Sequence, residues 1–171
     1  MKNESHLIEE WLDHYFSMGV DHVFLIDNGS TDDTVLKVAP WQRDGRVQVI
    51  SLPEPHQQIL HYWSAFQHFR IAERCKWLIV VDIDEFLFCK SGERLGHYLD
   101  RQRGIDAIYV NWTVFGSSGW DMQPTSARQS FVMAEPKLSR YTKCIFQPSL
   151  FTEYALSVGS GAGRGWFRPL L

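Results

Sequence analysis

The chain has 171 residues and a formal net charge of −3, which suits one domain with a sizeable hydrophobic core. A content of 44% hydrophobic and 14% aromatic residues excludes an intrinsically disordered chain, and the slightly acidic balance argues against a nucleic-acid partner. No apolar run reaches the ~20 residues of a membrane span, and three scattered cysteines without a CxxC pair indicate free thiols, so we expect a cytoplasmic protein.

Predicted helices and strands alternate along the chain. Apolar residues at helical spacing predict a first helix over 3–18, which Gly19 ends. Strands are predicted at 23–26, 47–51, 77–81 and 107–112, with helices at 31–38, 57–74 and 93–101 and two candidate strands at 130–134 and 143–147. This alternation is typical of an α/β domain with a mainly parallel sheet and helices on both faces.

Two acidic segments directly follow predicted strands. The segment "DNGSTDDT" places Asp27 at the end of the first strand, and "WLIVVDIDEF" places Asp82 and Asp84 after the third. Ligands of such folds bind beyond the carboxyl ends of the strands, so we expect both segments to border one site. If the third strand stays extended, Asp82 and Asp84 face the same side, and Glu85 points away from them.

The DxD pair predicts a metal site. Two neighbouring carboxylates repel each other unless a cation lies between them or one binds a proton. Mn²⁺ and Mg²⁺ prefer oxygen ligands and bridge carboxylates to phosphates, and they improve a diphosphate as a leaving group. We therefore predict Mn²⁺ or Mg²⁺ at Asp82 and Asp84. The alternative is a solvated strand end, where acidic residues are common.

The order of four segments resembles glycosyltransferase family 92 and related family-2-like glycosyltransferases of GT-A fold. These segments are "KNESHLIEEWLDHYFSMGVDHVFLIDNGSTDDT", "DIDEF", "NWTVFGSSG" and "KCIFQP". The resemblance implies metal-assisted, inverting transfer of a sugar from a nucleotide-diphosphate donor, with UDP-sugar favoured, to a hydroxyl of a glycan or another acceptor. It also implies a GT-A-like (Rossmann-like) domain over 1–157, without the family's first strand, and a glycine-rich tail at 158–171 that we expect to be disordered.

The resemblance also implies roles for single residues. Six positions match family residues at the donor and metal site: Glu4, Asp27, Gln58, Asp82, Asp84 and Lys143. Among them, Asp27 is implied to contact the nucleoside, and Lys143 the phosphates. Trp112 and Phe115 suit an acceptor-side wall, because an aromatic ring can stack on a sugar.

The general base that inversion requires is unassigned. Gln129 stands where the family tends to carry a glutamate, and an amide cannot accept the proton. Glu85, Asp121 and Glu135 are the candidates. Two other functions stay open: a non-catalytic fragment that binds a nucleotide sugar, and a Mg²⁺-dependent DxD phosphatase in which the first aspartate is the nucleophile.

Overall fold

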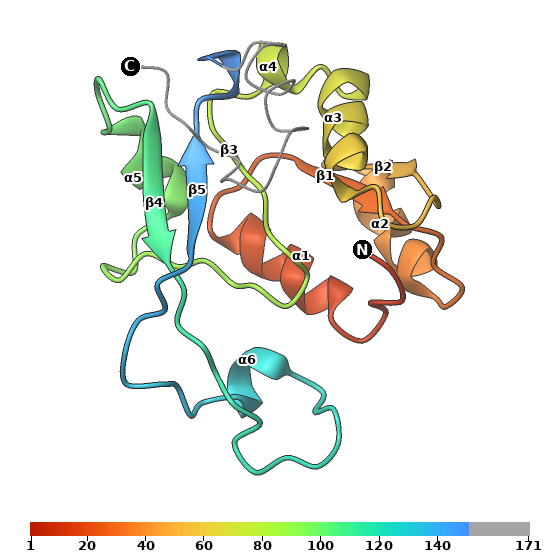
Figure 1. The fold of residues 1–171 in the computed structure, drawn as a ribbon, viewed down its shortest axis with the longest axis vertical. Helices are drawn as coiled ribbons and strands as arrows, with labels where there is room; N and C mark the ends of the chain where they lie inside the picture. Colours follow the sequence, from red (N-terminus) through yellow and green to blue (C-terminus); the bar gives the residue numbers. More distant parts are fainter. Residues whose placement is uncertain (151–171) are drawn as a thin grey trace.

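A computed structural model describes residues 1–150, so the predicted tail at 158–171 and the predicted domain end at 157 lie outside the described residues. Helices surround two small sheets, β1 and β2 on the right in Figure 1 and the other strands on the left. The helices are α1 Ile8–Ser17, α2 Thr34–Arg43, α3 Gln58–His68, α4 Ile71–Arg74, α5 Leu95–Asp100, α6 Ala127–Ser130 and the 3₁₀ turn η1 Pro148–Leu150. Within residues 1–150, none of these helices has the length and apolar character needed to cross a membrane.

The first sheet is parallel and has two strands, β1 Val23–Asp27 and β2 Val47–Ser51. Val23 lies opposite Val47, and Asp27 lies opposite Ser51. Side chains of β1 alternate between two apolar clusters: Leu25 packs with residues of α1 and α2, whereas Phe24 packs with residues of α3 and α4. Helices therefore cover both faces of this sheet, as the sequence predicts for an α/β domain.

The second sheet is antiparallel, which corrects the prediction of a mainly parallel sheet. Its order is β3-β5-β4, with β3 Leu78–Ile79, β4 Ala107–Asn111 and β5 Thr142–Phe146. The last strand, β5, lies in the middle and runs against both neighbours, so that Ile145 faces Ile79 on one side and Ile108 on the other. The chain reaches β5 after a long excursion beyond β4, and this return reverses the strand direction.

Several predicted elements have different bounds in the structure, among them the helix predicted at 31–38, which is α2 at Thr34–Arg43. The helix predicted at 57–74 breaks between α3 and α4, where Arg70 has a left-handed backbone at φ +53°. The strand predicted at 77–81 is shorter because only Leu78 and Ile79 pair with β5. The candidate strand at 130–134 forms one isolated bridge, between Ala134 and Phe115.

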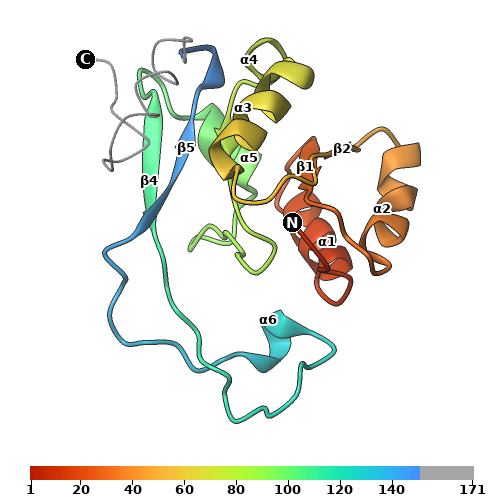
Figure 2. The ribbon, with the colours of Figure 1, turned by 45° about the vertical axis from the view of Figure 1, so that its right-hand side comes forward.

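Residues 112–141, here called the arm, connect β4 to β5 and carry α6. Figures 1 and 2 show the arm extending away from the two sheets. Glu10 of α1 fastens it: the carboxylate accepts hydrogen bonds from Ser126 Oγ at 2.6 Å, Ala127 N at 2.8 Å and Arg128 N at 3.2 Å. A carboxylate at a helix start satisfies amides that lack partners within the helix, so Glu10 caps α6 from outside.

Candidate functional site

The DxD segment forms a turn beyond β3. Glu85 N donates to Asp82 O at 3.1 Å, with Ile83 buried and Asp84 exposed between them. The sequence-based expectation of an extended segment at this point is wrong. The turn separates the environments of successive side chains, because Ile83 packs in the core cluster while Asp84 faces solvent.

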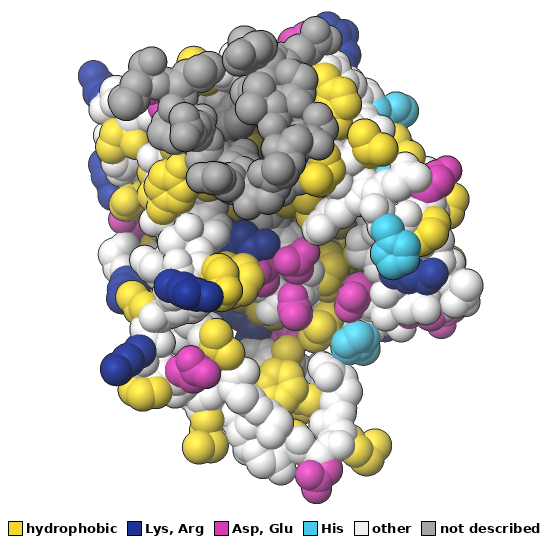
Figure 3. Space-filling model, viewed as in Figure 1, with side chains coloured by type: hydrophobic (Ala, Val, Ile, Leu, Met, Phe, Trp, Pro, Cys, Tyr) yellow, Lys and Arg dark blue, Asp and Glu magenta, His cyan; other side chains and the backbone are white. Residues whose placement is uncertain are grey.

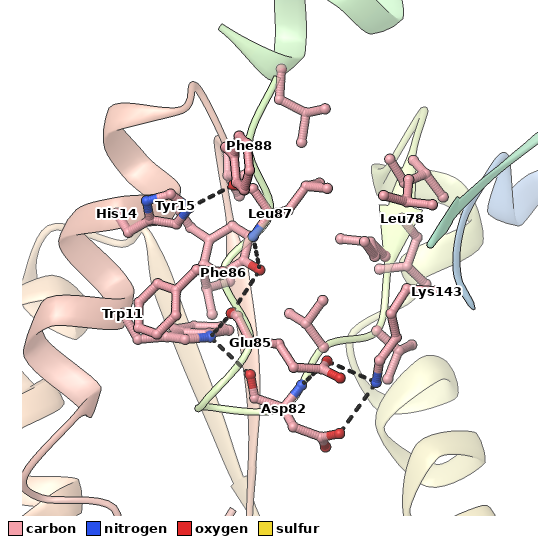
Figure 4. A pocket seen from close by; sticks show the side chains of 18 of the residues that line it. Trp11, His14, Tyr15, Leu78, Asp82, Glu85, Phe86, Leu87, Phe88 and Lys143 are labelled. Atoms are coloured by element: carbon pink, nitrogen blue, oxygen red, sulfur yellow. Dashed lines mark hydrogen bonds and ion pairs between the residues drawn. The ribbon is translucent and has the colours of Figure 1, made fainter. Parts of the chain in front are cut away.

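Helix α1 holds this turn through the side chains of Trp11 and Tyr15. Trp11 Nε1 donates to the carbonyl oxygens of Asp82 and Glu85, at 3.0 and 3.1 Å. The Tyr15 hydroxyl donates to Glu85 O at 3.0 Å and accepts from Leu87 N at 3.2 Å (Figure 4). Residues four apart lie on one helix face, so Trp11 and Tyr15 act together to fix the backbone of the turn.

Lys143 of β5 joins the two acids of the turn into a cluster, called here the acid–lysine cluster (Asp82, Glu85 and Lys143). Lys143 Nζ lies 2.8 Å from Glu85 Oε2 and 3.2 Å from Asp82 Oδ2, and Asp82 N donates to Glu85 Oε2 at 2.9 Å (Figure 4). Glu85 thus turns toward Asp82, contrary to the expectation that it points away. The Trp112 ring borders the cluster, with Lys143 Nζ 5.5 Å from its centroid.

The electrostatics of the cluster reflect partial burial. Burial is the largest influence on Glu85 and raises the pKa of its carboxyl, although Lys143 acts in the opposite direction. Burial lowers the pKa of Lys143, but Glu85 and Asp82 together outweigh it, so the pKa of the lysine is raised. Two carboxylates face one ammonium, and the side chain of Asp82 is 58% exposed. The cluster can therefore interact with an additional cation.

The raised pKa of Glu85 predicts a pH-dependent contribution to stability. Between the unfolded and folded pKa values, the folded chain binds more protons, so the free energy of unfolding falls as the pH rises above the ordinary value of 4.5. Glu85→Gln removes this titration. Urea denaturation gives the difference in free energy of unfolding between the wild type and the variant. We expect this difference to fall as the pH rises from 4.5 through the folded pKa of Glu85. A flat difference would contradict the prediction, and Glu135→Gln on the arm serves as control.

Helix α3 borders the cluster through Tyr62. Gln58 Nε2 donates to the Tyr62 hydroxyl at 2.8 Å. Burial raises the pKa of Tyr62 most, and the charges of Asp82, Lys143 and Glu85 also act on it. The structure therefore links Gln58 to Tyr62, which lines the same cavity as Asp82, Glu85 and Lys143 and which the sequence analysis missed. The signal for Tyr62 was its position four residues after Gln58 in a predicted helix.

Asp27 and Glu4 lie near the same region. Burial lowers the pKa of the Met1 amine, and the negative charges of Asp27, Glu4 and Asp82 oppose that shift, so all three carboxylates act electrostatically on this amine. Asp27 is buried, and its own turn engages the carboxylate: Ser30 donates from Oγ at 2.6 Å and from N at 3.1 Å. Asp27 therefore shapes the loop after β1.

The candidate bases occupy different places. Glu85 belongs to the acid–lysine cluster, whereas Asp121 lines a small hollow on the arm. Glu135 also lies on the arm, where its backbone N donates to Val114 O at 2.9 Å. Of the three, Glu85 is the candidate that the structure brings to Asp82.

The turn beyond β3 carries oxygen ligands that a metal ion could use. Among residues 1–150, no group of three or more histidine, cysteine, aspartate or glutamate side chains converges into a metal site. Asp82 and Asp84 still offer exposed carboxylate oxygens, the ligand type that Mn²⁺ and Mg²⁺ prefer. These ions often take only one or two protein carboxylates and complete their shell with water and substrate phosphates, so the two residues fit such an ion in ligand type and number.

The chain is thus a mixed α/β domain with two acids and a lysine clustered beyond β3. The family model of glycosyltransferase family 92 matches residues 2–156, and the chain belongs to this family. A family 92 protein of Oryza sativa subsp. japonica is 28% identical over 95 residues, covering 56% of this chain and 16% of that protein. A family 92 protein of Ricinus communis is 22% identical over 162 residues, covering 92% of this chain and 29% of that protein.

The chain thus spans less than a third of the length of these curated relatives. No solved structure gives a significant match to it.

Proposed function

We propose that the chain forms the donor-binding region of a GT-A-like glycosyltransferase. In this proposal, the enzyme transfers a sugar from a UDP-sugar to a hydroxyl of a glycan or another acceptor, with inversion at the sugar carbon. The observation that carries the proposal is the acid–lysine cluster beyond β3, in a chain of glycosyltransferase family 92. On the face seen in Figure 3, acidic side chains gather near the middle with basic ones beside them.

Each member of the site has a role suited to its chemistry. Lys143 would contact the diphosphate as a point charge. Asp82 and Asp84 would hold Mn²⁺ or Mg²⁺, which when bound neutralises the charge of the departing diphosphate. Glu85 would accept the proton of the acceptor hydroxyl, a role that its raised pKa favours because an efficient base titrates near the working pH.

The nucleoside end of the donor is assigned to the neighbouring residues. Two observations support this assignment: the charges of Asp27, Glu4 and Asp82 all act on the Met1 amine, and Gln58 donates to Tyr62, on which the charges of the cluster act. We propose that Asp27, Glu4 and Gln58 line the nucleoside pocket. Because Asp27 already accepts bonds from its own turn, its contribution is to fix the loop that meets the nucleoside.

A thermal-shift titration tests the donor site. UDP, GDP and several UDP-sugars are added with and without Mn²⁺ to the wild type and Asp84→Ala, with Asp44→Ala at the end of α2 as control. A ligand at about 100 times its Kd adds about 2.7 kcal/mol, which should raise the Tm by about 5–10 °C at this size. We expect the uridine ligands to raise the Tm of the wild type in a metal-dependent way. Asp84→Ala should lose this rise in Tm, and Asp44→Ala should keep it.

Each outcome of this titration decides one part of the proposal. No shift with any nucleotide in folded protein would contradict the donor site, and an equal shift without Mn²⁺ would contradict the metal. Release of free sugar from a bound UDP-sugar would favour catalysis over a non-catalytic nucleotide-sugar-binding fragment.

A further inference from the structure

A small hollow on the arm adjoins the larger cavity that contains the acid–lysine cluster, and Phe115, Gln123 and Phe131 line both. Its volume is about 300 Å³, at the lower end of the range for small-molecule pockets. Aromatic rings and polar groups line it together: Phe115, Ser117, Trp120, Asp121, Gln123 and Phe131. No lysine or arginine is among the lining residues, so the hollow differs in charge from the donor site.

Backbone hydrogen bonds give the hollow a defined frame. Ser118 Oγ accepts from Val132 N and Met133 N, both at 2.9 Å, and Gly116 N donates to Met133 O at 3.0 Å. Ser118 reaches this position because its backbone is left-handed, at φ +54°. These bonds join the two sides of the arm, so the hollow is preformed and does not depend on a ligand for its shape.

The lining selects a particular ligand chemistry. Phe115 and Trp120 are 47% and 51% exposed, and clustered exposed aromatic residues often mark a binding surface. The carboxylate of Asp121 and the amide of Gln123 add hydrogen-bonding groups beside the rings. A pyranose ring matches this combination, because one face carries C–H groups and its rim carries hydroxyls. A phosphate would meet the Asp121 carboxylate without a compensating cation.

We propose that this hollow binds one neutral sugar unit of the acceptor glycan. The role as acceptor subsite rests on the proposed glycosyltransferase function, whereas sugar binding itself can be tested alone. Trp120 and Phe115 stack on the apolar face of the sugar, and Asp121 and Gln123 bind its hydroxyls. The hollow therefore acts in acceptor selection and takes no part in binding the nucleotide.

Helix α1 relates this hollow to the donor site. Glu10 caps α6, and Phe131 follows α6 directly, lines the hollow and packs against the core cluster. The next residue of the same helix, Trp11, holds the turn that carries Asp82. Two adjacent residues of α1 thus fix the hollow and the donor site to one rigid element, which a transfer between two bound substrates requires.

Sugar binding to the full chain, without nucleotide or metal, tests the proposal. The probes are methyl glycosides of glucose, galactose, mannose, N-acetylglucosamine and fucose, and oligosaccharides that end in each of these sugars. Saturation-transfer NMR and isothermal titration measure their binding. We expect at least one probe to bind, and Trp120→Ala and Asp121→Asn each to weaken it by about tenfold or more. Leu138→Ala, exposed on the same arm but outside the lining, should bind like the wild type.

The outcomes separate this proposal from the donor site. Absence of binding for every probe at millimolar concentration would overturn it, as would equal binding by Trp120→Ala, Asp121→Asn and the wild type. Trp120→Ala, Asp121→Asn and Leu138→Ala should all keep the nucleotide-dependent thermal shift. Sugar binding without any nucleotide shift would contradict the proposed donor site and leave the hollow supported as a sugar site.

Discussion

Replacing Lys143 with methionine is expected to weaken UDP binding by about 10–100-fold, as measured by isothermal titration with Mn²⁺ present. A hydrogen bond to a charged group contributes about 1.5–3 kcal/mol, and each 1.4 kcal/mol is tenfold in affinity. Methionine keeps an unbranched apolar stem beside Trp112 but removes the ammonium. The variant leaves Glu85 beside Asp82 without their shared cation, so circular dichroism must first show that it is folded.

Lys76→Met is the matched control for this prediction. Lys76 Nζ lies 3.1 Å from Asp100 Oδ1, a distance close to that between Lys143 and Asp82, but the Lys76 pair is largely exposed and lies outside the cluster. The Lys76→Met variant should bind UDP like the wild type. If both variants bind equally well, Lys143 pairs with the acids of the turn for structural reasons alone, and the donor contact is lost from the proposal.

Local patterns predicted the elements that depend on neighbouring residues. The apolar runs at 23–26 and 47–51 match β1 and β2 to within one residue, and helices α1 and α5 lie inside their predicted ranges. The two strands stand out as short apolar runs and the two helices by helical spacing, which are the patterns that burial against neighbouring layers requires. Arg70 shows the limit: it adopts a left-handed backbone and breaks the helix predicted at 57–74, where no glycine or proline marks a stop.

The sequence did not predict the features that depend on long-range pairing, such as the position and direction of β5. The position of β5 between β3 and β4 is set by contacts with strands that precede it by more than 30 residues, and short apolar runs do not encode strand direction. The same holds for the link between Glu10 and α6, which joins residues 116 or more positions apart. A pattern in one segment cannot specify its partner in another.

The candidate site was anticipated by residue type more than by geometry. The sequence indicated Asp82 and Lys143, and the structure places them in one cluster. It also indicated Glu85, but in an orientation that assumed a continued strand. The assumption failed because β3 ends at Ile79 and the turn at Asp82 brings Glu85 back toward Lys143. A turn of this kind follows from its anchoring by α1, which is a tertiary contact.

That anchoring leads to the largest stability effect that we expect. Trp11→Phe should lower the free energy of unfolding by about 2–4 kcal/mol, because it removes two hydrogen bonds to the turn and part of a buried ring. Urea denaturation measures the loss. Tyr15→Phe, which removes a hydroxyl that both donates and accepts there, should lose about 1–3 kcal/mol.

Trp77→Phe separates hydrogen bonding from packing. The indole Nε1 of Trp77 is buried but has no hydrogen-bond partner within residues 1–150, so this change removes ring volume and no hydrogen bond there. We expect Trp77→Phe to cost clearly less than Trp11→Phe and to leave UDP binding intact. Trp11→Phe should also weaken UDP binding, because the turn that carries Asp82 and Asp84 loses its support. Equal losses of stability in the two variants would mean that Trp11 acts by packing alone, and unchanged UDP affinity in Trp11→Phe would mean that α1 does not position the donor site.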